Sequence, residues 1–190
     1  MSDALFQDRE FISIDYSTAD LPQGEYENCL FRKCSFSGTK FSKMTFSECS
    51  FEHCELSNAD LTGCSLREVT FTDCKMLGLS FDKCSSFLLS FFFENCILNY
   101  SSFFKLKLKN TFFKSCRLQE VDLSDADLTG ATFDHSDLSG TIFYNTRLEK
   151  ADFSTAEHFS IDPENNIITG AKFSTHNLQG LLNKYKIEII

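Results

Sequence analysis

The chain has 190 residues, a formal net charge of −9, 22 phenylalanines and no tryptophan. A chain of this length can bury a substantial core as one domain. Its acidic balance disfavours direct binding to nucleic acid, and its longest nearly apolar run, residues 87–93, is far too short to span a bilayer. Residues 1–10 are acidic and lack an apolar core, so we expect no secretion signal and a cytoplasmic protein.

A repeat of five residues runs through most of the sequence. Phe or Leu, rarely another residue, stands at every fifth position from Phe6 to Phe81 and again from Phe93 to Phe153, and the residue two places earlier is mostly small or apolar. On a helix five residues rotate by about 140°, and on a flat strand an odd spacing alternates between faces. The pattern is consistent if the backbone turns a corner once per repeat, which predicts a solenoid of stacked coils.

Three segments resemble the signature of the pentapeptide-repeat family, A-(D/N)-L-x-x. They are residues 59–63 (ADLTG), 126–130 (ADLTG) and 136–140 (SDLSG). The resemblance covers residues 4–155 and implies an all-β fold, a right-handed quadrilateral β-helix with four repeats, hence about twenty residues, in each coil. In that fold both the repeat centre and the residue two places before it point inward.

The two inward series can be named residue by residue. We expect the central series to include Phe31, Phe36, Phe51, Leu61, Phe71, Phe113, Leu128, Phe133 and Phe143. The second series includes Cys34, Cys54, Cys74, Ala59 and Ala126. Phenylalanine suits a narrow solenoid because identical rings can stack from coil to coil.

The nine cysteines follow the same repeat, and several are twenty residues apart, as Cys34, Cys54 and Cys74 are. In coils of this length their sulfurs would form a row with a spacing of about 4.8 Å. A disulfide needs an S–S distance of about 2.05 Å, and zinc needs about four convergent ligands. We therefore expect buried, reduced cysteines and no metal site.

The repeat is interrupted between Phe81 and Phe93, which are twelve residues apart, two more than two repeats. A bulge or short loop within residues 82–93 that restores the register is one explanation. The alternative is a bend that exposes a contact patch of Phe or Leu within residues 87–93, because seven residues cannot all face a narrow interior.

Two neighbouring segments carry opposite charges. Residues 95–119 contain five bases and no acid, and residues 120–137 contain six acids and no base. A solvated outer surface explains both blocks, and the acids are also a candidate surface for a partner. The six acids are Glu120, Asp122, Asp125, Asp127, Asp134 and Asp137.

The repeat decays after Phe153, which divides the chain into a repeat domain, residues 1–155, and a terminal segment, residues 156–190. Residues 162–166 (DPENN) predict a turn, and residue Thr175 is placed to cap a short helix. This helix would carry an apolar stripe of Leu178, Leu181, Leu182 and Tyr185. The stripe covers the open end of the solenoid or meets its twin across a two-fold axis, and the resemblance implies a homodimer through this segment.

The resemblance also implies a partner. Bacterial members of the quinolone-resistance (Qnr) and MfpA groups are acidic rods that bind DNA gyrase or topoisomerase IV in place of DNA. A rod from Phe6 to Phe153 is roughly 36 Å long, and duplex DNA of this length carries about twenty charges. The net charge of −9 falls short, so DNA mimicry requires the acids to gather on one face. Many Qnr proteins also have extended loops that are associated with protection from quinolones. In this chain the repeats contain only two additional residues, between Phe81 and Phe93.

No catalytic constellation or cofactor motif is recognisable. The histidines His53, His135, His158 and His176 are scattered along the sequence, and no glycine-rich phosphate loop occurs. We expect a non-enzymatic binding protein without a cofactor and without direct nucleic-acid or membrane binding. The alternative to a topoisomerase partner is an interaction scaffold for an unrelated protein, bound through residues 87–93 or at the charge boundary near residues 119 and 120.

Overall fold

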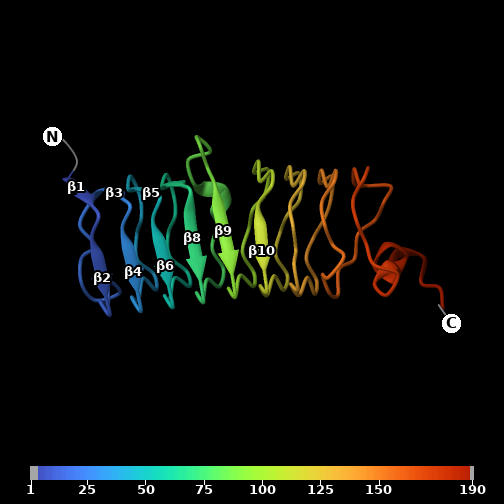
Figure 1. Ribbon diagram of the computed structural model, residues 1–190, viewed down its shortest axis with the longest axis horizontal. Helices are drawn as coiled ribbons and strands as arrows, with labels where there is room; N and C mark the ends of the chain where they lie inside the picture. Colours follow the sequence, from blue (N-terminus) through green and yellow to red (C-terminus); the bar gives the residue numbers. More distant parts are fainter. Residues whose placement is uncertain (1–3, 189–190) are drawn as a thin grey trace.

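The computed structural model describes residues 4–188, which form a straight rod of stacked coils with the two chain ends at opposite ends of the rod (Figure 1). Each coil has four sides, which we call the first to fourth faces in chain order. Bridged residues on one face are twenty positions apart in most coils, as in Asp15–Ser35 and Ser35–Glu55. This is the solenoid that the five-residue period predicted, and it has the right-handed quadrilateral form that the resemblance to the pentapeptide-repeat family implied.

Strands form on the first two faces and pair in parallel. The first face carries a four-stranded sheet of β1 (Ala4–Gln7), β3 (Gly24–Glu27), β5 (Thr45–Ser47) and β7 (Ser65–Arg67). The second face carries a six-stranded sheet of β2 (Glu10–Ile12), β4 (Leu30–Arg32), β6 (Ser50–Glu52), β8 (Val69–Thr72), β9 (Phe91–Glu94) and β10 (Phe112–Lys114). The third and fourth faces are held by isolated parallel bridges, as are the first and second faces of the C-terminal coils.

The corners explain why an odd period is compatible with extended backbone. The residue two places after most repeat centres has a positive φ, for example Asn28 at 49°, Glu48 at 55° and Glu68 at 52°. Among the described residues, 23 non-glycine residues have a positive φ, and 20 of them occupy this corner position, the exceptions being Leu88, His158 and Lys186. The corner therefore accepts many residue types, and the inward positions carry the sequence signal of the fold.

The core is a set of stacked side chains that runs along the rod. On the second face, phenylalanine rings from neighbouring coils stack with centroid separations of 4.7 to 5.4 Å. The rings belong to Phe11, Phe31, Phe51, Phe71, Phe93, Phe113, Phe133, Phe153 and Phe173. This continuous stack accounts for much of the unusual phenylalanine content, because each ring buries its faces against its neighbours.

All nine cysteines are buried free thiols. The thiol of Cys54 donates to the carbonyl oxygen of Phe31 at 3.3 Å, and the hydroxyl of Ser136 donates in the same way to Phe113 at 3.0 Å. The inward cysteine is therefore a small buried donor as well as a small hydrophobe.

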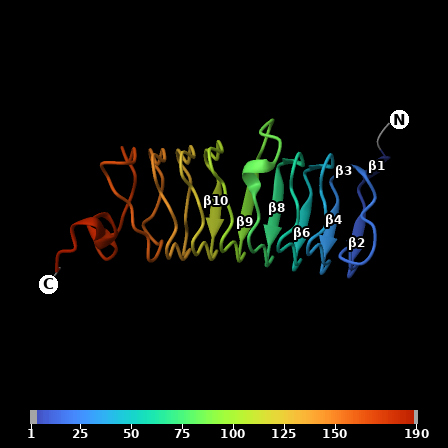
Figure 2. The same ribbon diagram turned by 180° about the vertical axis from the view of Figure 1, so that it is seen from behind.

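The interrupted coil contains a short 3-10 helix, η1 (Phe81–Lys83), followed by a loop that projects from the rod in both views (Figures 1 and 2). The Cys64 carbonyl oxygen accepts from the Ser85 amide twenty-one residues later, which is the hydrogen-bond offset of the regular coils. Phe71, in contrast, pairs with Phe93 twenty-two residues later instead of the regular twenty. The two extra residues thus lie between these points, where the loop restores the register. Both explanations for the interruption hold in part, because the same loop exposes two apolar side chains.

The terminal segment differs from the single helix that the sequence predicted. It forms two 3-10 helices, η2 (Leu178–Leu181) and η3 (Asn183–Tyr185), and the residue before η2 is Asn177 rather than Thr175. The Asn177 side chain accepts from the Ser174 amide and donates to the carbonyl oxygens of Phe153 and Ala156. These bonds tie the segment to the last coils, so docking to the rod decides its conformation.

Candidate partner-binding surface

The structure buries the residues assigned to the two inward series. The central series Phe31, Phe36, Phe51, Leu61, Phe71, Phe113, Leu128, Phe133 and Phe143 is buried. The second series Cys34, Cys54, Cys74, Ala59 and Ala126 is buried as well. These residues fill the rod, so surfaces for partners must be built from the outward positions and the corners.

The six acids of residues 120–137 do not form the single surface that the sequence predicted. Asp127 lies on the first face, Asp134 on the second, Asp137 on the third and Asp122 on the fourth, while Glu120 and Asp125 form corners. The physical reason is that consecutive residues wrap around the rod within one coil. Residues share a face when they are about twenty positions apart, so a block in the sequence becomes a belt.

Several of these aspartates serve the local turn. Asp127 accepts from the Thr129 amide at 3.2 Å and from its hydroxyl at 2.6 Å, and Lys109 lies 3.4 Å away. Partial burial acts to raise the pKa of Asp127, but the hydrogen bonds from Thr129 and the charge of Lys109 outweigh it, and the net pKa is lowered. The same arrangement joins Asp122 to Ser124 and Asp137 to Ser139.

A different set of acids gathers on the edge between the first and second faces, in the N-terminal coils. We call this set the acidic edge. It consists of Asp8, Glu10, Glu25, Glu27, Glu48 and Glu68, all exposed. Two guanidinium groups lie nearby, Arg9 over the ring of Phe6 and Arg67 over the ring of Phe87. Sequence inspection missed this set because its members are dispersed over sixty residues.

The projecting loop borders the acidic edge. Phe87 is 66% exposed and Leu88 is 63% exposed, whereas Phe91 and Phe93 are buried. A hollow of about 390 Å³ lies under the loop, lined by Glu48, Arg67, Glu68 and by loop residues including Leu88. The loop thus places two apolar side chains next to carboxylates on one edge of the rod.

The bases of residues 95–119 are also distributed by the coil. Lys105, Lys107 and Lys109 are exposed on the first face and its leading corner, just beyond the loop. Lys114 pairs with Glu94 at 2.7 Å on the second face, and Arg117 lies on the third. The edge between the first and second faces is therefore acidic on the N-terminal side of the loop, and the first face is basic directly beyond the loop.

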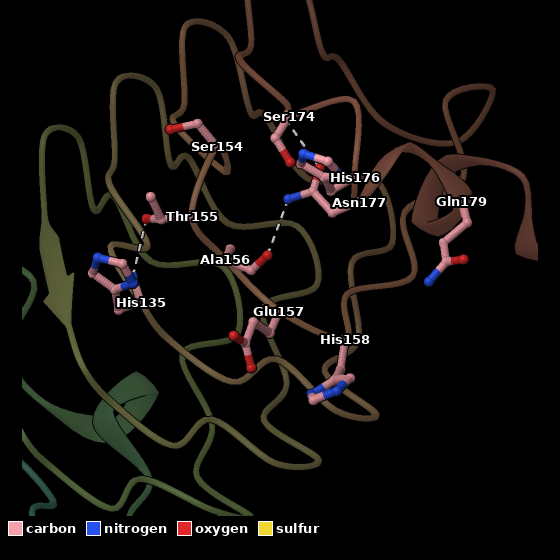
Figure 3. Close-up of a pocket in the computed structure, with 10 residues that line it drawn as sticks. All are labelled: His135, Ser154, Thr155, Ala156, Glu157, His158, Ser174, His176, Asn177 and Gln179. Carbon is pink, nitrogen blue, oxygen red and sulfur yellow. Dashed lines mark hydrogen bonds between the residues drawn. The ribbon is translucent and has the colours of Figure 1, made fainter.

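Three histidines that are far apart in the sequence line one open hollow of about 440 Å³ near the C-terminal end (Figure 3). These are His135, His158 and His176, which the rod brings to one hollow although they are scattered along the sequence. The His158 Nδ1 atom lies 2.9 Å from Asp137 Oδ1. Within residues 4–188, no hydrogen bond joins a serine hydroxyl to a histidine ring, and the hollow is open and lined mainly by polar residues.

The terminal segment leaves apolar side chains exposed. Leu178, Leu182 and Tyr185 are exposed, while Leu181 is half-buried and packs on the core. Lys184 fixes the segment from its other side through Asp162 and Glu164, each at 2.7 Å. The predicted dimer contact is thus divided between a docked residue and three accessible ones.

Among residues 4–188, no group of three or more His, Cys, Asp or Glu side chains is arranged to hold a metal ion. The same part of the chain contains no helix with the length and apolarity needed to cross a membrane.

Comparison with known families agrees with the repeat architecture. A pentapeptide repeat region model matches residues 24–91, and a model of eight pentapeptide repeats matches residues 116–154. The two ranges together include more than half of the chain. The chain belongs to the pentapeptide-repeat family.

A solved structure shares this fold. A trypsin-treated form of QnrB1, described as a plasmid-mediated fluoroquinolone resistance protein, aligns with a TM-score of 0.53 and 19% identity over 100% of this chain and 92% of that chain. HetL from Nostoc sp. strain PCC 7120, a pentapeptide repeat protein involved in heterocyst differentiation regulation, gives 0.40 and 18% identity over 91% of this chain and 86% of its own. At 19% identity the likeness to QnrB1 establishes the fold alone. No curated protein matches the chain.

Proposed function

We propose that this pentapeptide-repeat protein is a non-enzymatic, cytoplasmic binding protein that engages a type II topoisomerase, DNA gyrase or topoisomerase IV. In this proposal the rod occupies the DNA site of the enzyme and modulates sensitivity to quinolones or related toxins. The fold shared with a fluoroquinolone resistance protein over the whole chain supports the choice of partner. The proposed function requires no cofactor and no direct contact of this protein with nucleic acid or membrane.

The acidic edge carries the proposal. Its six carboxylates and two neighbouring guanidinium groups leave a net of four negative charges over four consecutive coils. These coils extend about 14 Å along the rod, and one strand of duplex DNA has about four phosphates in that length. The edge therefore resembles one DNA strand in charge spacing, whereas the belt of residues 120–137 does not.

A supercoiling assay tests this function. Purified protein added to gyrase at micromolar concentration should inhibit supercoiling of relaxed plasmid. A Glu48→Lys/Glu68→Lys variant should inhibit about tenfold less, because opposite charges then face the basic DNA site. The matched control is Glu120→Lys/Glu157→Lys, which changes the net charge equally on another side of the rod. Absence of inhibition by the wild-type protein would contradict the proposal.

Protection from a quinolone is a separate property. The projecting loop contains only two residues beyond the regular repeat, and Phe87 and Leu88 are its exposed apolar side chains. We expect binding to gyrase with weak protection, since so short a loop reaches little beyond the rod. Supercoiling measured with a fluoroquinolone, with and without the protein, separates protection from inhibition.

We further propose that the protein is a homodimer through the terminal segment. The exposed Leu178, Leu182 and Tyr185 and the half-buried Leu181 form the contact. Leu182→Glu should split the dimer and leave the rod folded, because Leu182 is exposed in the single chain. Light scattering measures the mass of the wild-type and variant proteins, and circular dichroism shows whether the variant is folded. If the wild-type protein is a monomer, the terminal segment only caps the end of the rod.

The exposed loop supports a second candidate function, that of an interaction scaffold for an unrelated protein. Phe87 and Leu88 would then anchor the partner, with the charge change beyond the loop setting its orientation. Co-purification with a Phe87→Ser/Leu88→Ser variant as control tests it. Recovery of a partner other than a topoisomerase, lost with the variant, would support the scaffold.

A further inference from the structure

The projecting loop contains a repeat that lies outside the core (Figures 1 and 2). Counted back in fives from Phe93, Leu88 falls at a repeat centre, and Ser86 falls two places before it, at a second inward position. Residues 86–90 (SFLLS) therefore have the pattern of a regular repeat. In the structure, however, Leu88 is 63% exposed, and Ser86 is exposed as well. The first face of the interrupted coil thus lacks an inward centre from its own strand.

Phe91 is much larger than the residues at the equivalent position of the neighbouring coils. Its backbone pairs with that of Val69, two places before a ring of the second-face stack. The equivalent residues in the two coils on each side are Cys49, Val69, Thr111 and Ala131. A close-packed position that suits these small side chains has no room for a phenylalanine ring. The ring of Phe91 is nevertheless only 5% exposed, so it extends into another part of the core.

The ring distances show that Phe91 takes the place of the missing first-face centre. In a regular coil, the ring of the first-face centre Phe46 lies 5.5 Å from the preceding fourth-face centre and 5.6 Å from the following second-face centre. The ring of Phe91 lies 5.3 Å from Phe81 and 5.5 Å from Phe93, which are the corresponding centres around the loop. Phe91 therefore fills the core position that Leu88 would occupy in a regular repeat.

The outward position of the loop leaves polar groups without partners. Within residues 4–188, three buried side-chain atoms have no hydrogen bond, and all three flank the loop: Ser65 Oγ, Arg67 Nε and Asp82 Oδ1. The Glu48 amide donates to the Arg67 carbonyl oxygen at 2.9 Å, whereas the equivalent amide of Glu68 has no such bond in the described chain. Unpaired buried polar groups lower stability. The observed conformation thus buries the Phe91 ring at the expense of hydrogen bonds on the first face.

We propose that the interrupted coil has two registers, in which Phe91 and Leu88 compete for one core position. In the register of the structure, Phe91 fills this position and residues 86–90 project. In the second register, Leu88 turns inward as the first-face centre, residues 86–90 pair with β7, and the two-residue excess moves to residues 82–85. The centres before and after the loop keep their places in both registers. A partner that contacts the exposed Leu88 binds only the first register and shifts the population toward it.

Reducing the size of residue 91 tests this competition. Phe91→Val introduces the residue found at the equivalent position one coil earlier, Val69, and leaves the core position to Leu88. Chymotrypsin should then cleave after residues 87–89 about tenfold more slowly than in the wild-type protein, as expected if about nine-tenths of the molecules hold the loop inward. A cavity alone predicts the opposite, because truncation of a core side chain destabilises the fold and speeds cleavage. Cleavage after the exposed Tyr185 is the internal control and should be unchanged.

Two further variants make the result specific. Phe91→Val/Leu88→Ser should return to within about threefold of the wild-type cleavage rate, because serine gains little from the core position. Phe87 and Leu89 remain as cleavage sites in this protein. Phe91→Leu is a milder change, for use if Phe91→Val does not fold, and should slow cleavage about threefold.

Circular dichroism shows which variants are folded, and mass spectrometry locates each cut. Cleavage of the folded Phe91→Val or Phe91→Leu protein at the wild-type rate or faster would overturn the proposal. Slow cleavage that persists after Leu88→Ser would overturn it as well, because the protection would then be independent of Leu88. No topoisomerase is present, so the result is independent of the proposed function.

Discussion

At the residue scale, burial determines the behaviour of the cysteines. Burial raises the pKa of Cys49 and of Cys84 to about 12. A thiol with so high a pKa contains almost no thiolate at neutral pH, and thiolate is the reactive form. Cys49 and Cys84 therefore belong to the scaffold.

Thiol titration checks this directly. At pH 8 the native protein should react slowly with Ellman's reagent, with fewer than one thiol modified in the time that denatured protein needs for all nine. The physical reason is that reagent access and thiolate formation both require a coil to open. Rapid reaction of several thiols in the native protein would show that the rod opens far more readily than its stacked core implies.

The positive φ of the corner residues determines how a substitution there changes the free energy of unfolding. Gly63 has a φ of +72° and no atom within 4 Å of the place where a Cβ would stand. Gly63→Ala therefore tests backbone strain alone and should lower the free energy of unfolding by about 1 kcal/mol. The matched change is Lys43→Gly, at a corner with a φ of 66°. This change should raise the free energy of unfolding by up to about the same amount. Urea unfolding measures both, and a stabilising Gly63→Ala would contradict the account.

At the scale of elements, the terminal segment depends on one close approach. A Cβ on Gly180 would stand 2.5 Å from the carbonyl oxygen of Phe159 and equally close to its ring. The Gly180 carbonyl also accepts from the Ile161 amide at 2.9 Å. The backbone of η2 thus lies directly on the last coil, and no larger residue fits between them.

Gly180→Ala should therefore displace the terminal segment, at a cost of roughly 1 to 3 kcal/mol, the usual range for overpacking. Limited proteolysis should cut the variant within residues 160–188 much faster than the wild-type protein. Gln179→Ala, at the exposed neighbouring position, is the control and should behave as wild type. Equal cleavage of all three proteins would show that the segment is not held by this contact.

At the scale of the whole molecule, the sequence predicts the rod but not its surfaces. A five-residue period fixes the inward positions, so Phe31 and Cys54 could be placed from the sequence because each repeats the same local geometry. The acidic edge could not be found in this way, since Glu48 and Glu68 meet only through the twenty-residue coil. Reading the outward residues in steps of twenty would have shown both this edge and the dispersal of Asp122 to Asp137 around the rod.

The terminal segment shows the other limit of prediction. Its apolar residues have helical spacing, which favoured an α-helix, but long-range contacts decide the outcome. The Asn177 side chain bonds to carbonyl groups more than twenty residues earlier, and Gly180 lies against Phe159. Such contacts leave no periodic signal in the sequence.

Displacement of DNA from gyrase tests the central claim most directly, the claim that the acidic edge takes the place of DNA. The wild-type rod should displace a fluorescent duplex from gyrase, as followed by anisotropy, and Glu48→Lys/Glu68→Lys should need about tenfold more protein. Glu120→Lys/Glu157→Lys should displace the duplex as the wild type does. If the wild-type protein leaves the duplex bound at saturating concentration, or if both variants behave alike, the acidic edge does not bind the DNA site.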